Sequence, residues 1–302
     1  CIRDRPRSGP RAEPPGRPTV GVDQTAGMRI GIHLPQFGRV AGRDAVTEAA
    51  RLAEDLGYDD VWVSDHTVHP AGQDYPSPYL LDPFVSLTWA AAVTERIGLG
   101  TSVLVAATHN PLQTANTLAS LDVLSGGRLI VGVGVGWSRA EYEALGQRFE
   151  DRGARTDEIV DLWRACWSTD PVSFSGEHYA VDEVRVLPQP EREIPIWVGG
   201  GVEAAYRRAV ERGDGFQLIG VTPDQARPVV ERLRVDRPEP SFTISLRTGW
   251  DPNGMDPGII RAELVAYAEA GVQHVVAAPW RRDRDAWLDS MRQLAAIVDL
   301  PG

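Results

Sequence analysis

Lysine is missing from this chain, and all 31 basic residues are arginine. Without a lysine amine, the protein cannot form a Schiff base, bind pyridoxal phosphate covalently or build the lysine of a P-loop. Any phosphate must be held by arginine, hydroxyl groups or backbone N–H groups. The arginine bias is most simply explained by genome composition.

Cysteine is scarce, since only Cys1 and Cys166 are present. They could form one bridge at most, and no cysteine-based metal site. Cys166 lies between Trp163 and Trp167 on a predicted helix, which indicates a buried thiol.

Excess positive charge and long apolar runs are also lacking. The net charge is −11, which argues against a nucleic-acid backbone or an anionic membrane as the main partner. No apolar run approaches the roughly 18 residues of a membrane span, and there is no apolar segment of a secretory signal. We therefore expect a cytoplasmic protein that acts on a small molecule.

Residues 1–27 differ from the rest of the chain, being rich in Arg, Pro and Gly without periodicity. This composition predicts a disordered extension. Met28 begins the first predicted strand and is interpreted as the natural start, which leaves residues 28–302 as the folded domain.

From Met28 the chain alternates between strand and helix patterns. The predicted strands are 29–34, 60–64, 97–104, 128–133, 194–198, 215–219, 242–246 and 274–278. The predicted helices are 44–56, 83–94, 111–125, 139–145, 154–167, 203–212, 223–234, 257–270 and 285–298. Asp44 is expected to cap the first helix and Gly57 to end it.

Eight apolar strands, each followed by a helix, predict a parallel sheet covered on its outer face. Eight such units favour an α/β fold of the closed TIM-barrel type. The alternative is a doubly wound sheet with an appended subdomain. Residues 168–193 interrupt the alternation after the fourth unit and are expected to form an extended surface insertion.

In a TIM barrel, catalytic groups lie on the loops that follow the strands. Unusual residues recur at these positions in the sequence. They are His33 and Gln36, Asp65 and His66, Thr101 to Val103, Gly134 to Trp137, Gly199 to Gly201, Trp250 and Asp251, and Trp280. Their common position predicts a site at one end of the barrel.

Asp65 and His66 follow an apolar strand directly. With His69 they could form a metal site, but no further cluster of acids or histidines follows the later strands. His66 could instead be structural, or it could act as an acid/base or cofactor-contacting imidazole.

Two glycine-rich turns are further candidates. Gly199 to Gly201 precede a helix and could cradle an anion with their N–H groups, or simply form a tight turn. Gly132, Gly134 and Gly136 resemble part of a dinucleotide fingerprint, but the third glycine is misplaced. The second turn therefore favours close approach of a flat ring.

Together these segments resemble the luciferase-like flavin and deazaflavin oxidoreductases, from Met28 to the C-terminus. The segments that carry the resemblance are Gly31 to Pro35, Val61 to His66, Leu99 to Leu104, Gly126 to Trp137, Ile194 to Gly201 and Gly213 to Phe216. Several motifs in the right order are specific for this superfamily.

The resemblance implies a barrel that holds a flavin-like ring, most like the branch using the deazaflavin coenzyme F-420, with FMN as the alternative. It implies that Asp65 contacts the cofactor and that His66 is an acid/base. It also implies a cis peptide at Ser102–Val103 against the ring. Gly199 to Gly201 would form a phosphate-binding turn, and a homodimer is expected.

Trp137 departs from the family pattern. The deazaflavin-dependent sugar-phosphate dehydrogenases carry a glutamate at this position, so their reaction is doubtful here. Gly136 and Trp137 are expected to contact the cofactor. A tryptophan beside the ring suggests an apolar or aromatic substrate pocket, which His33 would line, together with Trp62 or Trp280 if they face it. The resemblance predicts hydride transfer between the deazaflavin and this organic substrate. The alternatives are a reduced-FMN-dependent monooxygenase acting on an alkanal or alkanesulfonate, a non-catalytic cofactor-binding barrel and a metal hydrolase.

Overall fold

The computed structural model describes residues 27–72 and 77–301, and the predicted disordered segment lies outside them except for Gly27. Eight parallel strands form the barrel. They are β1 (Arg29–His33), β2 (Asp60–Val63), β3 (Gly98–Thr101), β5 (Leu129–Gly134), β8 (Ile196–Gly199), β9 (Gly215–Ile219), β10 (Thr243–Thr248) and β11 (His274–Ala277). Pairing of β3 with β5 closes the sheet, which confirms the TIM barrel and excludes the doubly wound alternative.

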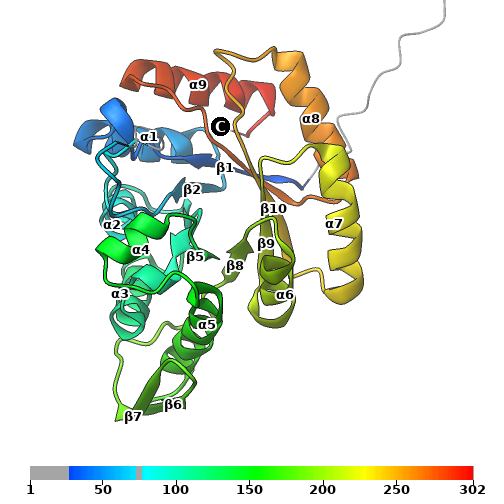
Figure 1. The fold of residues 1–302 in the computed structure, drawn as a ribbon. Coiled ribbons are helices and arrows are strands. Elements are labelled where there is room, and N and C mark those ends of the chain that lie inside the picture. The colour runs from blue at the N-terminus through cyan, green and yellow to red at the C-terminus, as the bar shows by residue number, and fades with distance from the viewer. Residues whose placement is uncertain (1–26, 73–76, 302) are drawn as a thin grey trace, which may run out of the picture.

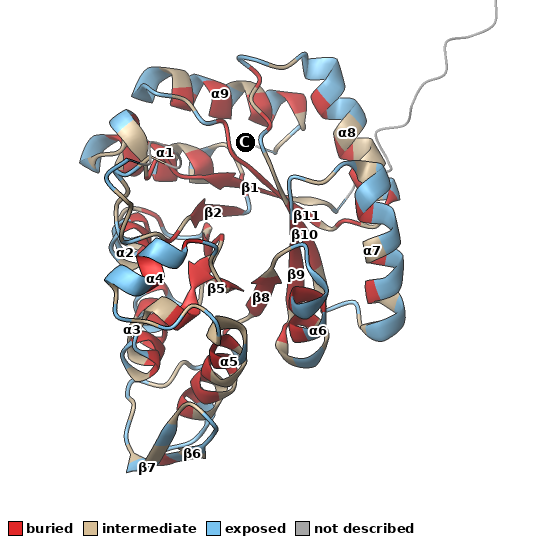
Figure 2. Cartoon of the chain, viewed as in Figure 1, coloured by how far each residue is buried: buried red, intermediate tan, exposed pale blue. Residues whose placement is uncertain are grey.

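Helices surround the barrel, and their outward faces are exposed while the strands are buried (Figures 1 and 2). They are α1 (Arg43–Asp55), α2 (Pro83–Val93), α3 (Pro111–Ser125), α4 (Arg139–Ala144), α5 (Arg152–Ser168), α6 (Glu203–Arg212), α7 (Pro223–Asp236), α8 (Pro257–Glu269) and α9 (Arg284–Ile297). Two 3-10 turns, Gly38–Val40 and Ala106–Thr108, follow β1 and the short strand β4 (Leu104–Val105).

Most predicted boundaries hold within two residues, with two corrections. Asp44 does not cap α1, because the N-cap is Gly42 without a side-chain cap. Asp44 lies instead in the first turn, where its charge favours the helix N-terminus. The predicted strand 97–104 is broken between β3 and β4 by the cis peptide Ser102–Val103, as the resemblance implied.

The insertion after the fourth unit forms a hairpin of β6 (Val172–Ser175) and β7 (Ala180–Val184). In Figure 1 this hairpin lies beyond α5, away from the barrel strands. It is antiparallel and largely exposed, which agrees with the predicted extended surface segment.

The barrel interior is filled by Trp62, which is fully buried and stacks on Trp197 with ring centroids 5.4 Å apart. Its neighbours are glycines for this reason: a Cβ on Gly31 would lie 2.6 Å from the Trp62 indole nitrogen. Trp62 therefore belongs to the core and does not line a substrate pocket.

Cys166 is a free, buried thiol, and burial raises its pKa to about 11. Within residues 27–72 and 77–301, no helix combines the length and apolar character required to cross a bilayer.

Candidate active site

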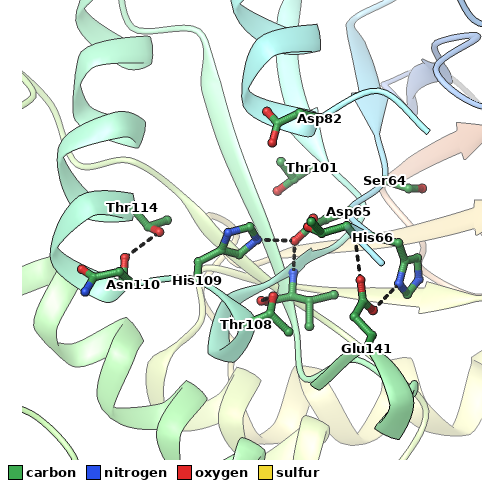
Figure 3. A network of polar contacts seen from close by, with 12 residues as sticks. Ser64, Asp65, His66, Asp82, Thr101, Thr108, His109, Asn110, Thr114 and Glu141 are labelled. Atoms are coloured by element: carbon green, nitrogen blue, oxygen red, sulfur yellow. Dashed lines mark hydrogen bonds and ion pairs between the residues drawn. The ribbon is translucent and has the colours of Figure 1, made fainter. Parts of the chain in front are cut away.

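Asp65 and His66 lie on the loop after β2. They are neighbours in the chain, but their side chains bond to different partners (Figure 3). His66 pairs with Glu141 of α4, and Asp65 pairs with His109, which follows β4 and the adjoining 3-10 turn. The loops after the second, third and fourth barrel strands are therefore joined by two carboxylate–imidazole pairs.

The His66–Glu141 pair joins Nδ1 to Oε2 at 2.8 Å. The other carboxylate oxygen of Glu141 accepts the N–H groups of Thr67 at 2.6 Å and Val68 at 3.2 Å. Burial acts to raise the pKa of Glu141, but the hydrogen bonds from His66 and from these N–H groups outweigh it, and the pKa is lowered. Glu141 is thus a buried, ionised acceptor beneath the imidazole.

Asp65 is buried, and its Oδ2 accepts two hydrogen bonds. The Val105 N–H donates at 2.8 Å, and the His109 Nε2 lies at 2.7 Å. Burial acts to lower the pKa of His109, but the hydrogen bond and charge of Asp65 raise it above its usual value. The ring of Phe84 packs edge-on against His109. This pair ties β4 to the end of β2, while the predicted contact of Asp65 with a cofactor stays a prediction.

The Ser102–Val103 bulge is held from both sides. The Ser102 carbonyl accepts a hydrogen bond from Arg247, and its hydroxyl donates to Gln217 at 2.5 Å. A Cβ on Gly134 or Gly199 would lie 2.5 Å from a methyl carbon of Val103. These glycines therefore make room for the half-buried Val103 side chain at the mouth.

The three glycines at the end of β8 differ in the space around them. Gly199 accommodates Val103, and Gly200 has φ 153° and would bring a Cβ within 2.7 Å of the Ala205 side chain. Gly201 has open space around it. Its neighbour α6 has no side-chain cap. Phosphate binding by this turn stays a prediction.

Gly136 and Trp137 lie on the loop after β5. Gly136 has φ 66°, and a Cβ there would meet Val105 at 2.6 Å. Trp137 is 56% exposed, yet its ring lies edge-on to His66 with centroids 5.6 Å apart. An exposed indole beside the candidate acid/base is consistent with the predicted pocket.

A second aromatic group lies at the ends of β1 and β11. The centroid of the Trp280 ring is 5.5 Å from that of His33 and 4.8 Å from that of Phe37. The Arg247 guanidinium carbon lies 5.2 Å from the Trp280 centroid. Burial, followed by the charge of Arg247, lowers the pKa of His33 to about 3. His33 is therefore neutral at physiological pH, and it lies behind Trp280, which is 44% exposed.

The side chains of Asp65, His66 and His69 do not converge. Asp65 bonds His109, whereas the rings of His66 and His69 are 5.6 Å apart. Among the residues that the structure describes, no three His, Cys, Asp or Glu side chains are grouped to hold a metal ion.

Glu141 and His109 were not predicted from the sequence. Ser138, Arg139, Ala140 and Glu141 read as a capping box, which would direct the Glu141 side chain to its own helix. Ser138 does cap α4, but Glu141 reaches the loop after β2 instead. His109 precedes the Asn110 cap of α3 and gives no further signal.

Comparison with known proteins identifies the family and the fold. The luciferase-like monooxygenase family matches residues 27–253. The chain belongs to this family. Its fold is shared by a monooxygenase from Streptomyces bottropensis, with a TM-score of 0.74 and 22% identity over 89% of this chain and 98% of the other.

The fold is also shared by an F-420-dependent secondary alcohol dehydrogenase solved with an F-420–acetone adduct. It has a TM-score of 0.76 and 21% identity over 90% of this chain and 99% of the other.

In sequence, the chain is 36% identical to an F-420-dependent glucose-6-phosphate dehydrogenase of Amycolatopsis mediterranei, over 60% of this chain and 54% of that protein. It is 34% identical to an uncharacterised protein of Mycobacterium tuberculosis, over 64% of this chain and 72% of that protein. The chain thus spans about half the length of the named dehydrogenase it matches.

Proposed function

We propose that this luciferase-like protein is an oxidoreductase that uses coenzyme F-420 and a small, apolar or aromatic organic substrate. The observation that carries the proposal is the His66–Glu141 pair beside the exposed Trp137 at the mouth of the barrel. The names of the related dehydrogenases, which state F-420 dependence, support the choice of cofactor.

The residues at the mouth suit a flat, ring-shaped cofactor. Gly134 and Gly199 leave room for the Val103 side chain, which offers an apolar surface at the mouth. Asp65 and Arg247 hold the backbone on either side of this bulge. The deazaflavin, when bound, supplies the two-electron hydride chemistry.

His66 is proposed to handle the proton that accompanies hydride transfer, since general acid–base catalysis by a positioned imidazole contributes roughly 10²–10⁴-fold. Gly199 to Gly201 are proposed to hold the phosphate of the cofactor through backbone N–H groups, one of the donor types that a chain without lysine still offers.

An apolar or aromatic substrate is supported by two exposed indoles, Trp137 and Trp280. Trp137 also replaces the glutamate that the resemblance associates with sugar-phosphate dehydrogenases. The names of several relatives nevertheless make glucose 6-phosphate a necessary member of any substrate panel.

The test is to titrate the purified protein with oxidised coenzyme F-420 and, separately, with FMN, following fluorescence. We expect F-420 to bind and FMN to bind more weakly. Binding of FMN alone would overturn the cofactor assignment.

The F-420-loaded protein is then assayed with aliphatic and aromatic alcohols and ketones and with glucose 6-phosphate. Turnover of glucose 6-phosphate alone would overturn the proposed substrate class. Oxygen consumption that requires reduced FMN and an alkanal would favour a monooxygenase. Tight F-420 binding without turnover, unchanged in His66→Ala, would favour a non-catalytic barrel.

A further inference from the structure

We infer that Glu141 is a positioning residue that holds the proton of His66 on Nδ1 and leaves Nε2 as the atom that exchanges a proton with the substrate. The inference rests on the proposed function for its catalytic meaning. Its basis is the hydrogen-bond pattern around the two side chains (Figure 3).

Glu141 must be the acceptor in this pair. It lies within a buried part of α4, and its pKa is lowered, so the carboxylate is ionised near neutral pH. An ionised carboxylate only accepts hydrogen bonds. It already accepts from the N–H groups of Thr67 and Val68 and therefore takes a third donor, the Nδ1–H of His66.

Nε2 is the free end of the imidazole. Among the described residues, none hydrogen-bonds this nitrogen, whereas Nδ1 is fully engaged. The side chain of His66 is 15% exposed, so the ring is accessible from the mouth. In the neutral ring, a proton on Nδ1 leaves a lone pair on Nε2.

Proton transfer at Nε2 would keep the imidazole in contact with Glu141. A proton leaving the substrate would bond to the Nε2 lone pair, and the resulting imidazolium would lie against the Glu141 carboxylate. The substrate hydride would pass to the deazaflavin, so electrons and protons balance. Burial, followed by the charge of His66, lowers the pKa of His69, which keeps this neighbour from adding a second positive charge. The neighbouring carboxylate, Asp65, is hydrogen-bonded to His109 and not to His66.

The capping position of Glu141 argues against a purely local role. At the third residue of α4, Glu141 could bond the backbone N–H of its own cap, as in a capping box. Ser138 still caps the helix, through the Glu141 N–H at 3.3 Å. Instead, the Glu141 carboxylate accepts its three hydrogen bonds from His66 and from the backbone of the loop that carries it.

The experiment is NMR of protein labelled with ¹⁵N-histidine, without cofactor or substrate, so that it is independent of the proposed function. In the wild type, we expect neutral His66 to show a protonated Nδ1 and an unprotonated Nε2. In Glu141→Gln, the amide oxygen should accept from the Thr67 and Val68 N–H groups, which turns the amide N–H toward Nδ1, so we expect neutral His66 to carry its proton on Nε2 instead.

The matched control is Glu143→Gln, which removes a charge from an exposed position of the same helix. It should leave the proton of neutral His66 on Nδ1, as in the wild type. A wild-type His66 protonated on Nε2, or an unchanged His66 tautomer in Glu141→Gln, would overturn the inference. The wild-type spectrum decides the tautomer even if Glu141→Gln does not fold.

Kinetics add a second readout once a substrate is known. In Glu141→Gln, kcat should be reduced while F-420 affinity is retained, whereas Glu143→Gln should keep the wild-type kcat. A loss of folding alone would lower kcat and the amount of F-420 bound together. If no turnover is found for any substrate, the NMR result still tests the position of the proton.

Discussion

The His66–Glu141 pair and the His274–Asp60 pair each join an imidazole to a carboxylate, but their surroundings differ. His66 and Glu141 lie at the mouth, where the imidazole has one engaged nitrogen and is partly exposed. His274 and Asp60 lie inside the barrel, where both side chains are buried. There the ring uses both nitrogens, one 2.9 Å from Asp60 and the other 2.8 Å from the Ser245 hydroxyl.

The interior pair ends a continuous row of buried hydrogen bonds. Ser102 donates to Gln217, Gln217 donates to Ser245 at 3.2 Å, and Ser245 bonds His274. Every polar atom in this row has a partner, as buried polar groups require. The comparison teaches that the free nitrogen, rather than the presence of an acid beside a histidine, separates the candidate catalytic pair from the structural pair.

The largest expected effect is on turnover at the mouth. His66→Asn should lower kcat by about 10²–10⁴-fold, because the imidazole is the proposed proton carrier. Asparagine retains an N–H donor toward Glu141, so the fold should be kept. Steady-state kinetics with F-420 measure the loss, and added imidazole should restore part of the rate. Wild-type kcat in this variant would contradict the role of His66.

Breaking the interior pair should mainly affect stability. His274→Ala leaves the buried Asp60 carboxylate without the His274 hydrogen bond, and we expect a loss of about 3 kcal/mol or more in the free energy of unfolding. Urea denaturation measures it. The comparison variant His66→Ala should lose only about 1 kcal/mol, because Glu141 keeps two backbone donors. Equal losses would erase the distinction between the two pairs.

A smaller effect on stability is expected from overpacking the Ser102–Val103 bulge. Gly199→Ala would place a Cβ 2.5 Å from Val103, and overpacking of this kind costs about 1–3 kcal/mol. Gly201→Ala is the matched control, since its Cβ would meet open space. Thermal unfolding of both variants checks the difference.

Adding Val103→Ala to Gly199→Ala should recover part of the stability if the two side chains collide. Independent, additive losses in this double-mutant cycle would show that the glycine does not serve Val103.

The smallest expected effect is on the pH dependence of stability. Both Glu141 and Asp60 have lowered pKa values despite burial, so each stabilises the fold above its unfolded pKa, and this is lost as pH falls through the folded value. His109 has a raised pKa, so its contribution is complete below 6.5 and is lost as pH rises through the folded value.

His109→Asn should therefore remove one component of the stability loss on the alkaline side and leave the acid side unchanged. Urea unfolding at a series of pH values from acid to alkaline measures both sides. An unchanged alkaline slope in this variant would mean that His109 does not contribute through its charge.

Much of the fold could be predicted, because strand and helix periodicity and local end signals are short-range. The sequence Asn110-Pro111 through Ser125-Gly126 predicted α3 with its observed bounds, and Gly57 follows α1 with φ 79°. The break at Ser102–Val103 was implied by the family resemblance rather than by periodicity. The predicted N-cap of α1 was wrong. Asp44 is a residue type that commonly caps helices, but α1 begins earlier, after Gly42.

The site was predicted in part. Placing Asp65, His66, Trp137 and Trp280 at the mouth required only the polarity of parallel strands, which brings their carboxyl ends to one edge. The partners Glu141 and His109 were missed, and Trp62, which was considered for the pocket, fills the core.

The sequence by itself determined the barrel, the order of its elements and the end at which the polar loops gather, since each follows from patterns within about fifteen residues. Only the tertiary structure decided that Asp65 turns to His109 and His66 to Glu141, residues 44 and 75 positions away. Neighbouring side chains on a loop select partners by the space and donors around them, and those come from other strands. That choice decides which imidazole nitrogen is left free.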